Sequence, residues 1–127
     1  MTAARTGARP SVLLVDDDEA FRLTLARSFR SRGYDVCVAG GYDDALAGVR
    51  MNAPQSALVD LRMPGRSGLE LVEAMTRHHP DIVVVVLTAD RSATSEAEAI
   101  RRGAKGYVRK PADTDEIIAA LTAARAR

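Results

Sequence analysis

Five short, mostly apolar runs recur along the chain, and a longer segment separates each run from the next. The runs cover residues 12–15, 36–39, 57–60, 82–87 and 106–109. Apolar runs without a polar alternation are typical of strands that are covered on both faces. Parallel strands need long crossovers, which are usually helices, so the pattern predicts a strand–helix unit repeated five times. The predicted fold class is therefore α/β, (βα)5, with a five-stranded parallel sheet and helices on both faces.

The segments between the runs carry apolar residues at helical spacing. Gly33 and Pro80 suit the ends of the first and third helices, the second should end near residues 52–54, and Asp113 can cap the last. The residues predicted to face the core in the first, second, third and fifth helices are, in chain order, Phe21, Leu25 and Phe29; Ala45, Leu46 and Val49; Leu69, Val72 and Met75; and Ile117, Ile118 and Leu121.

The fourth helix, predicted over residues 92–102, has the weakest apolar pattern of the five. Its buried face is expected to consist of Ala93, Ala97 and Ile100. Small side chains bury little surface, so this helix should pack lightly. Since low contact density lowers the cost of rearrangement, movement is expected here first.

Length and composition indicate one domain whose net charge is close to zero. With 127 residues the chain can bury a core of its own, over residues 11–127, while residues 1–10 lack periodicity and are predicted to be a disordered tail. A formal charge of +1 argues against direct nucleic-acid binding or a membrane partner. The single cysteine, Cys37, excludes an internal disulfide framework. No run is long enough to span a bilayer and no signal peptide begins the chain, so the expected location is cytoplasmic.

Polar side chains stand where four of the predicted strands end. Asp16 and Asp17 follow the first strand, Asp60 the third, Thr88 the fourth and Lys110 the fifth. In an open parallel sheet, ligands bind outside the carboxyl ends of the strands. These five side chains should therefore converge on one edge if their strands are adjacent.

Together these groups suit a phosphoryl-transfer site. Three neighbouring carboxylates would repel one another unless a cation joined them, and hard oxygen ligands beside a phosphoryl group suit Mg²⁺. A hydroxyl donor and an ammonium complete the inventory for holding a phosphoryl group. The implied chemistry is metal-assisted attack of a carboxylate on phosphorus.

The chain resembles the receiver domain of bacterial two-component response regulators from Ser11 to about Ala124. The resemblance rests on the order and spacing of four motifs: Val15-Asp16-Asp17, Val59-Asp60-Leu61-Arg62-Met63-Pro64-Gly65, Leu87-Thr88-Ala89 and Gly103-Ala104-Lys105-Gly106-Tyr107-Val108-Arg109-Lys110-Pro111. It implies the flavodoxin-like strand order 2-1-3-4-5 of the chemotaxis regulator CheY.

The resemblance also implies residue roles. Asp60 would be the phosphoacceptor, and Thr88 and Lys110 would contact the phosphoryl group. Mg²⁺ would be bound by Asp60, by Asp16 and Asp17, and by the backbone carbonyl of Arg62. Tyr107 would be an aromatic switch coupled to Thr88, and the Lys110-Pro111 peptide is typically cis in the family.

Partners and output follow from the same resemblance. The phosphoryl donor would be a sensor histidine kinase or a histidine phosphotransfer protein. The domain would not be an enzyme but a switch that catalyses its own phosphorylation and slow dephosphorylation. Its output surface would be the fourth helix, fifth strand and fifth helix, used for docking or a phosphorylation-dependent homodimer.

Within the family, Val59-Asp60-Leu61-Arg62 and Lys110-Pro111-Ala112-Asp113 are closest to a redox-responsive subgroup. Regulators of that subgroup carry a C-terminal helix-turn-helix of the Fis type, which this sequence lacks. The chain is therefore either a stand-alone receiver, such as a phosphorelay shuttle, or a fragment of a longer regulator.

Simpler roles compete with several of these assignments. The acidic cluster could cap a helix, although Asp18 is better placed for that. Tyr107 could be an ordinary half-buried packing residue, and Cys37 is expected to fill the core rather than sense redox state. The adjacent His78 and His79 cannot both face one metal from a helix and should be solvated.

Other function classes make different demands on the sequence. An aspartyl-phosphate hydrolase would need a second aspartate two residues after Asp60, where Arg62 stands. A dinucleotide or flavin module would need a glycine-rich loop where Asp16, Asp17 and Asp18 lie. A phosphorylation-independent interaction module remains open. Arg62 and Asp90 flank the predicted site, and the hypothesis is that they pair across its mouth and hinder a hydrolytic water.

Overall fold

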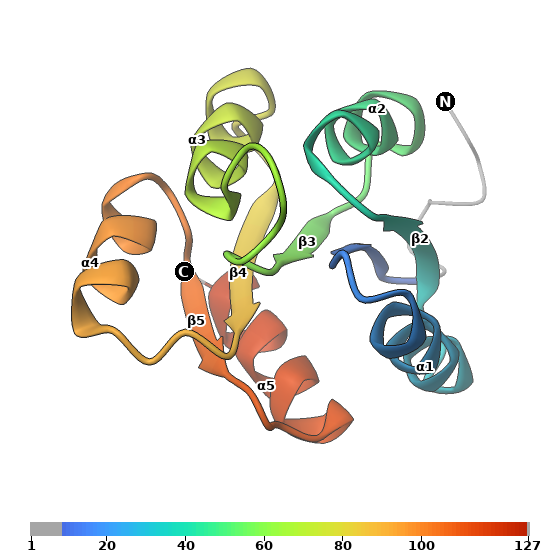
Figure 1. Cartoon of the computed structure of the whole chain (residues 1–127). Coiled ribbons are helices and arrows are strands. Elements are labelled where there is room, and N and C mark those ends of the chain that lie inside the picture. Colours follow the sequence, from blue (N-terminus) through green and yellow to red (C-terminus); the bar gives the residue numbers. More distant parts are fainter. Residues whose placement is uncertain (1–8, 127) are drawn as a thin grey trace.

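The computed structural model describes residues 9–126 and contains five strands alternating with five helices (Figure 1). No helix in this part of the chain is both long and apolar enough to cross a membrane. The tail predicted for residues 1–10 falls almost wholly outside the described residues. The elements are β1 (Ser11–Val15), α1 (Glu19–Ser31), β2 (Asp35–Ala39), α2 (Tyr42–Asn52), β3 (Ser56–Val59), α3 (Gly68–His78), β4 (Val83–Thr88), α4 (Ala93–Arg101), β5 (Gly106–Arg109) and α5 (Thr114–Arg125).

All strand pairs are parallel, in the order β2-β1-β3-β4-β5, which confirms the predicted fold class and strand order. The register aligns the strand ends. Val15 of β1 pairs with Val59 of β3, and Val59 pairs with Val86 of β4. The residues that follow β1 and β3 therefore leave the sheet side by side, and β4 runs slightly farther before its polar end at Thr88.

Two apolar layers enclose the sheet, because successive strand residues point to opposite faces. Leu13 and Val15 of β1 face the layer built with α2, α3 and α4, whereas Val12 and Leu14 face the layer built with α1 and α5. Figure 1 shows the same division of the helices between the two sides of the sheet. Strands buried on both faces explain why the sequence has continuous apolar runs rather than alternation.

Side-chain caps fix where four of the helices begin, including Ser92 at the start of α4. Asp18 is the N-cap of α1 and accepts a hydrogen bond from the backbone N–H of Phe21 at 3.1 Å, as expected for this residue. Asp113 caps α5 in a reciprocal capping box with Glu116, which confirms the predicted cap. Ser67 forms the same kind of box with Glu70 at the start of α3. These caps set the first turn of each helix beside a loop at the carboxyl edge of the sheet.

The predicted buried face of α4 is wrong. Its buried residue is Ala99, and Glu96 on the same helix pairs with Arg109 of β5 at 2.6 Å. Ion pairs to neighbouring elements, which an apolar pattern cannot reveal, orient this helix. The three residues predicted to face the core are exposed: Ala93, Ala97 and Ile100. The light packing itself is as predicted, because a single alanine side chain of α4 is fully buried.

Gly68 lets the start of α3 approach the backbone that carries Asp60. Its N–H donates to the carbonyl oxygen of Leu61 at 3.1 Å. A Cβ at Gly68 would collide with the carbonyl oxygen of Asp60 and lie 2.5 Å from Cα of Leu61. Because backbone atoms cannot move aside as a flexible side chain can, this position requires glycine.

We expect Gly68→Ala to lower the free energy of unfolding by about 1–3 kcal/mol, the usual cost of overpacking, in urea denaturation. Gly48→Ala is the matched control, since its new Cβ would meet the side-chain tip of Leu13 at 3.3 Å and not backbone. That control should be neutral or stabilising because alanine favours a helix interior. Equal losses in the two variants would refute the close-packing explanation.

Candidate functional site

The polar side chains at the strand ends meet at one edge of the sheet. Asp16 and Asp17 follow β1, Asp60 follows β3, Thr88 ends β4, and Lys110 follows β5. Backbone hydrogen bonds join the neighbouring strand ends. The N–H of Asp60, for example, donates to the carbonyl of Val15 at 3.0 Å. Strand register therefore brings together residues that are far apart in the sequence.

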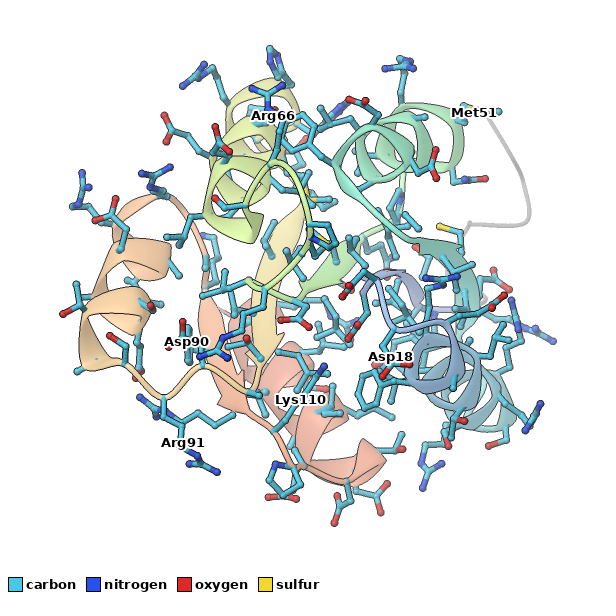
Figure 2. All side chains as sticks on the ribbon, in the orientation of Figure 1. Asp18, Met51, Arg66, Asp90, Arg91 and Lys110 are labelled. Atoms are coloured by element: carbon cyan, nitrogen blue, oxygen red, sulfur yellow. The ribbon has the colours of Figure 1, made fainter. Side chains whose placement is uncertain are left out.

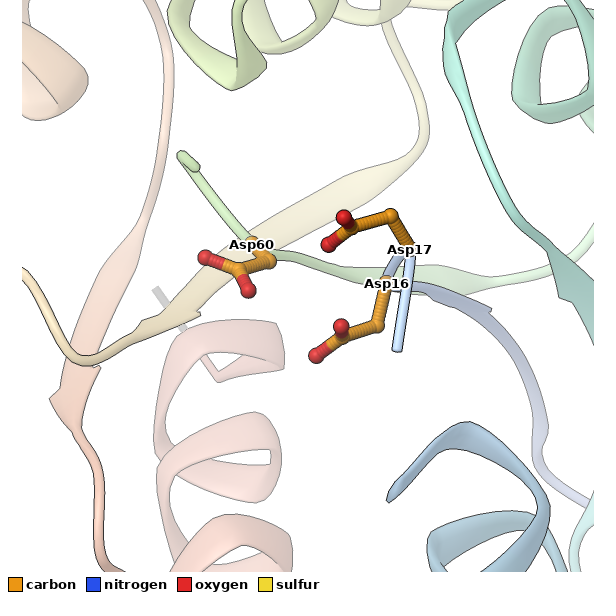
Figure 3. A group of neighbouring side chains, drawn as sticks. All are labelled: Asp16, Asp17 and Asp60. Atoms are coloured by element: carbon orange, nitrogen blue, oxygen red, sulfur yellow. The ribbon is translucent and has the colours of Figure 1, made fainter. Parts of the chain in front are cut away.

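The three carboxylates form a tight cluster (Figure 3). Asp16, Asp17 and Asp60 each offer an oxygen such that these atoms lie within 4.8 Å of one another. Asp16 and Asp60 are buried, with 5% and 8% of their surface exposed, whereas Asp17 is exposed to solvent. The cluster thus has one open side, and its hard oxygen atoms are the ligands that divalent cations such as Mg²⁺ prefer.

Both oxygens of Asp60 have defined partners. Its Oδ1 accepts hydrogen bonds from the hydroxyl of Thr88 at 2.9 Å and from the backbone N–H of Arg62 at 3.0 Å. Its Oδ2 accepts a longer bond from Nζ of Lys110 at 3.3 Å. These contacts fix the carboxylate and leave Oδ2 as the less engaged oxygen.

Lys110 links the loop after β5 to the acidic cluster. Its Nζ donates to Oδ2 of Asp16 at 2.7 Å as well as to Asp60. The guanidinium of Arg91 donates to the backbone carbonyl of Lys110 at 3.2 Å, and the Lys110-Pro111 peptide is cis, as in the family. Figure 2 shows Lys110 between the start of α1, marked by Asp18, and the loop before α4.

Burial and charge pairing shift the pKa values of Asp16 and Lys110. Burial raises the pKa of Asp16 and outweighs the opposing hydrogen bond from Lys110. For Lys110, burial lowers the pKa, but the hydrogen bond to Asp16 and the charges of Asp60 and Asp16 outweigh it, so its pKa is raised. At neutral pH the ammonium therefore stays charged and offsets part of the repulsion among the carboxylates.

A chain of hydrogen bonds leads from Asp60 to β5. Thr88 is fully buried; it donates to Asp60, and its Oγ1 accepts a bond from the backbone N–H of Asp90 at 3.3 Å. The hydroxyl of Tyr107, on β5, donates to the carbonyl oxygen of Asp90 at 3.3 Å. Burial raises the pKa of Tyr107, which keeps its phenol a donor at neutral pH.

Arg62 and Asp90 face each other across the mouth of the site. The Nε of Arg62 lies 3.9 Å from Oδ2 of Asp90, and the Arg62 side chain is 67% exposed. Asp90 also accepts from the N–H of Ser92 and the hydroxyl of Ser95, at 2.8 and 3.1 Å. The Ser92 hydrogen bond is the main reason that the pKa of Asp90 is lowered. Asp90 is thus a fixed anion, and Arg62 a loosely held cation beside it.

Sequence reasoning missed three residues around the site. The guanidinium of Arg22 donates to the carbonyl oxygen of Asp16 at 2.7 Å, and the ring of Phe21 lies 4.0 Å from Nζ of Lys110. Gly68 supports the backbone of Asp60. No apolar pattern signals these contacts, because each one depends on how the loop after a strand folds back on its neighbours.

Cys37 and the two adjacent histidines lie away from the site. Cys37 is half-buried on β2 and packs against the core layer, as a core-filling residue would. His78 is exposed, and both His78 and His79 precede β4, so they lie toward the amino ends of the strands. The site is at the carboxyl ends.

Comparison with known proteins decides the family. The sequence model of the family described as the response regulator receiver domain matches residues 12–122, which is most of the chain. The chain is a response regulator receiver domain. The acidic pocket of this receiver domain, made of Asp16, Asp17 and Asp60, fits the phosphoacceptor site of the family.

Two regulators illustrate the similarity in sequence. The receiver domain is 40% identical over 120 residues to the photosynthetic apparatus regulatory protein RegA of Rhodobacter capsulatus, covering 94% of this chain and 65% of RegA. It is 38% identical over 115 residues to the acid tolerance regulatory protein ActR of Rhizobium meliloti, covering 91% of this chain and 59% of ActR. The chain thus spans about three fifths of the length of these relatives.

A solved structure shows the same similarity in three dimensions. A response regulator from Burkholderia pseudomallei, with a phosphorylated aspartic acid, a calcium ion and citrate, superposes with a TM-score of 0.85 at 37% identity. The match covers 88% of this chain and 66% of that one. A response regulator similar to this chain over 66% of its length therefore carries a phosphorylated aspartic acid.

We expect Lys110→Met to destabilise the domain by about 1–3 kcal/mol at pH 7, because it leaves buried carboxylates without their counter-charge. The pKa of Asp16, already raised in the folded domain, would rise further. An acid whose folded pKa is raised costs stability as pH rises through that pKa, so the deficit should shrink as pH falls toward 4.

Urea denaturation between pH 4 and pH 7 measures this effect. The control is the double variant Lys110→Met with Asp16→Asn, which removes one uncompensated charge and should recover part of the stability at pH 7. A deficit that stays constant across this pH range would exclude the electrostatic explanation.

Proposed function

We propose that this receiver domain accepts a phosphoryl group on Asp60 from a sensor histidine kinase or a histidine phosphotransfer protein. The observation that carries the proposal is the environment of Asp60. Its carboxylate is buried at a strand end and is bonded by the hydroxyl of Thr88 and the ammonium of Lys110. Two further carboxylates, Asp16 and Asp17, stand beside it.

In the proposed reaction, an oxygen of Asp60 forms a bond to phosphorus while the P–N bond to the donor histidine breaks. The leaving imidazole nitrogen keeps the electron pair of that bond. Oδ2 is the better nucleophile, because Oδ1 is held by two donors. Lys110, which already contacts Oδ2, supplies positive charge where the phosphoryl oxygens arrive.

The residues present fit a divalent cation, since three carboxylate oxygens lie within 4.8 Å and one side of the cluster is open. We assign Mg²⁺ to Asp16, Asp17, Asp60 and the backbone carbonyl of Arg62, where it would neutralise negative charge on the transferring group. Thr88 and Lys110 would bind oxygens of the phosphoryl group. The acidic residues orient the site, and Asp60 alone forms the covalent bond.

Readout follows from the bonds that Thr88 makes. A phosphoryl group on Asp60 adds strong acceptor oxygens, so Thr88 exchanges its bond to Asp60 for one to the new group. That shift pulls on Asp90 and, through its carbonyl, on the hydroxyl of Tyr107. We assign the switch to Thr88 and Tyr107, and the output surface to α4, β5 and α5.

We treat residues 11–127 as one receiver domain, with docking or a phosphorylation-dependent homodimer as its output. The RegA and ActR relatives are longer than this chain, so an attached output domain and a redox-responsive pathway stay predictions. The competing functions are a phosphorylation-independent interaction module and a phosphorelay shuttle with no attached output domain.

The direct test is incubation with acetyl phosphate and Mg²⁺, followed by mass spectrometry. We expect one phosphoryl addition in the wild type and none in Asp60→Asn, because the amide cannot act as the nucleophile. Asp81→Asn, which alters an exposed acid before β4, is the matched control and should be modified normally. Absence of any addition to the wild type favours the interaction module.

The pairing of Arg62 and Asp90 should lengthen the life of the aspartyl phosphate by hindering water. We expect Arg62→Ala and Asp90→Ala each to shorten this lifetime by about two- to fivefold, a small effect because exposed ion pairs are weak. The lifetime is measured from the rate at which inorganic phosphate is released after acetyl phosphate is removed. Arg66→Ala is the control, because Arg66 lies over the Tyr42 ring and does not pair with Asp90. Unchanged lifetimes in both test variants would contradict the hypothesis that this pair hinders water.

A further inference from the structure

Phe21 places an aromatic face against the ammonium of Lys110. The distance from Nζ to the ring centroid is 4.0 Å, well within the range of a cation–π interaction. Phe21 is half-buried on the first turn of α1, and Lys110 lies on the loop between β5 and α5. The ring also lines a small cavity of about 10 Å³ that reaches Asp16 and Asp60. The ring is therefore a wall of the acidic site as well as part of the apolar layer.

An aromatic ring suits this position electrostatically. Its face attracts a cation without carrying a charge, so it adds no repulsion to the three carboxylates already present. A fourth acid would compete for the cation and increase that repulsion, and an aliphatic side chain would offer no attraction. The ring thus contributes a weak hold on Lys110 that is independent of the carboxylates.

The first turn of α1 is tied to the loop that carries the acids. The side chain of Asp18 caps the N–H of Phe21 at 3.1 Å, and the guanidinium of Arg22 bonds the carbonyl of Asp16 at 2.7 Å. These bonds fix the backbone of Phe21 relative to Asp16, and the ring packs against the apolar layer formed with α1 and α5. It can act as a stationary support while the contacts of Lys110 change.

We propose that Phe21 is a positioning residue for Lys110, whose ring keeps the ammonium at the site while the carboxylates exchange partners. This inference rests on the proposed phosphorylation of Asp60. In that reaction Asp16 would bind Mg²⁺ and Asp60 would bond to phosphorus, so the hydrogen bonds that now hold Nζ at 2.7 and 3.3 Å would weaken. The ring takes no part in that exchange and retains the ammonium near the incoming phosphoryl oxygens.

The competing explanation is that Phe21 only fills space, since it packs against the layer formed with α1 and α5. Fluorination separates the two explanations. Fluorine atoms on the ring weaken its negative face while changing its shape little. Site-specific replacement of Phe21 by 4-fluoro-, 3,5-difluoro- and 3,4,5-trifluorophenylalanine therefore varies the attraction for Lys110 at nearly constant packing.

Initial rates of phosphorylation by acetyl phosphate with Mg²⁺ should fall stepwise along this series, by about two- to fivefold in total, the range expected for a partly exposed cation–π contact. The matched control is the same series at Phe29, which is fully buried and packs edge-on against Tyr34 at 4.9 Å. Phosphorylation rates of the Phe29 series should not change. Urea denaturation of each variant checks that folding is intact.

A second measurement does not depend on phosphorylation. In the metal-free protein, the ring current of Phe21 should shift the NMR signals of the Lys110 methylene protons next to Nζ upfield, and Phe21→Leu should abolish that shift. Unshifted signals would overturn the inference. A wild type that is phosphorylated, with rates that stay flat along the Phe21 series, overturns the positioning role alone. A wild type that takes no phosphoryl group overturns the proposed function and the inference together.

Discussion

The burial of two carboxylates beside a third at one edge of the sheet is the constraint on which the site depends. Two of them are buried, where charge is least well screened, so the folded state tolerates them only with a compensating cation. The ammonium of Lys110 supplies that compensation at 2.7 Å from Asp16 and 3.3 Å from Asp60. One ammonium neutralises the three carboxylates only in part. The cluster can therefore still bind a cation, as a metal-assisted phosphoacceptor must.

The scaffold divides into a rigid part that holds this charge and a lighter part that can respond to it. Strands β1, β3 and β4 are buried on both faces and carry the acids and Thr88. Helix α4 buries one alanine and is oriented by ion pairs such as Glu96 with Arg109, which are partly exposed. Since partly exposed pairs stabilise weakly, movement of α4 costs far less than movement of a strand.

The apolar runs were sufficient to predict the strands and the polar residues at four of their ends, because both signals are local and strong. The strand order, which brings those ends together, came from the family resemblance. Long apolar runs identify strands buried on both faces, and parallel topology then aligns their ends. The buried face of α4 could not be predicted, since alanines give a weak pattern and Glu96 is oriented by a partner on β5. The contacts of Phe21 and Gly68 also escaped prediction. The first joins segments far apart in the sequence, and the second depends on how tightly the loop between β3 and α3 turns.

Asp90 links the site to the proposed output surface through its hydrogen bonds. Its backbone N–H bonds Thr88, its carbonyl accepts from Tyr107, and its side chain holds Ser92 and Ser95 at the start of α4. One residue thus joins the predicted phosphoryl contact, the predicted switch tyrosine and the helix with the weakest packing. A displacement of Thr88 cannot leave all of these bonds intact. The coupling therefore needs no long pathway: one loop, bonded on three sides, is the element whose two arrangements the site can favour differently.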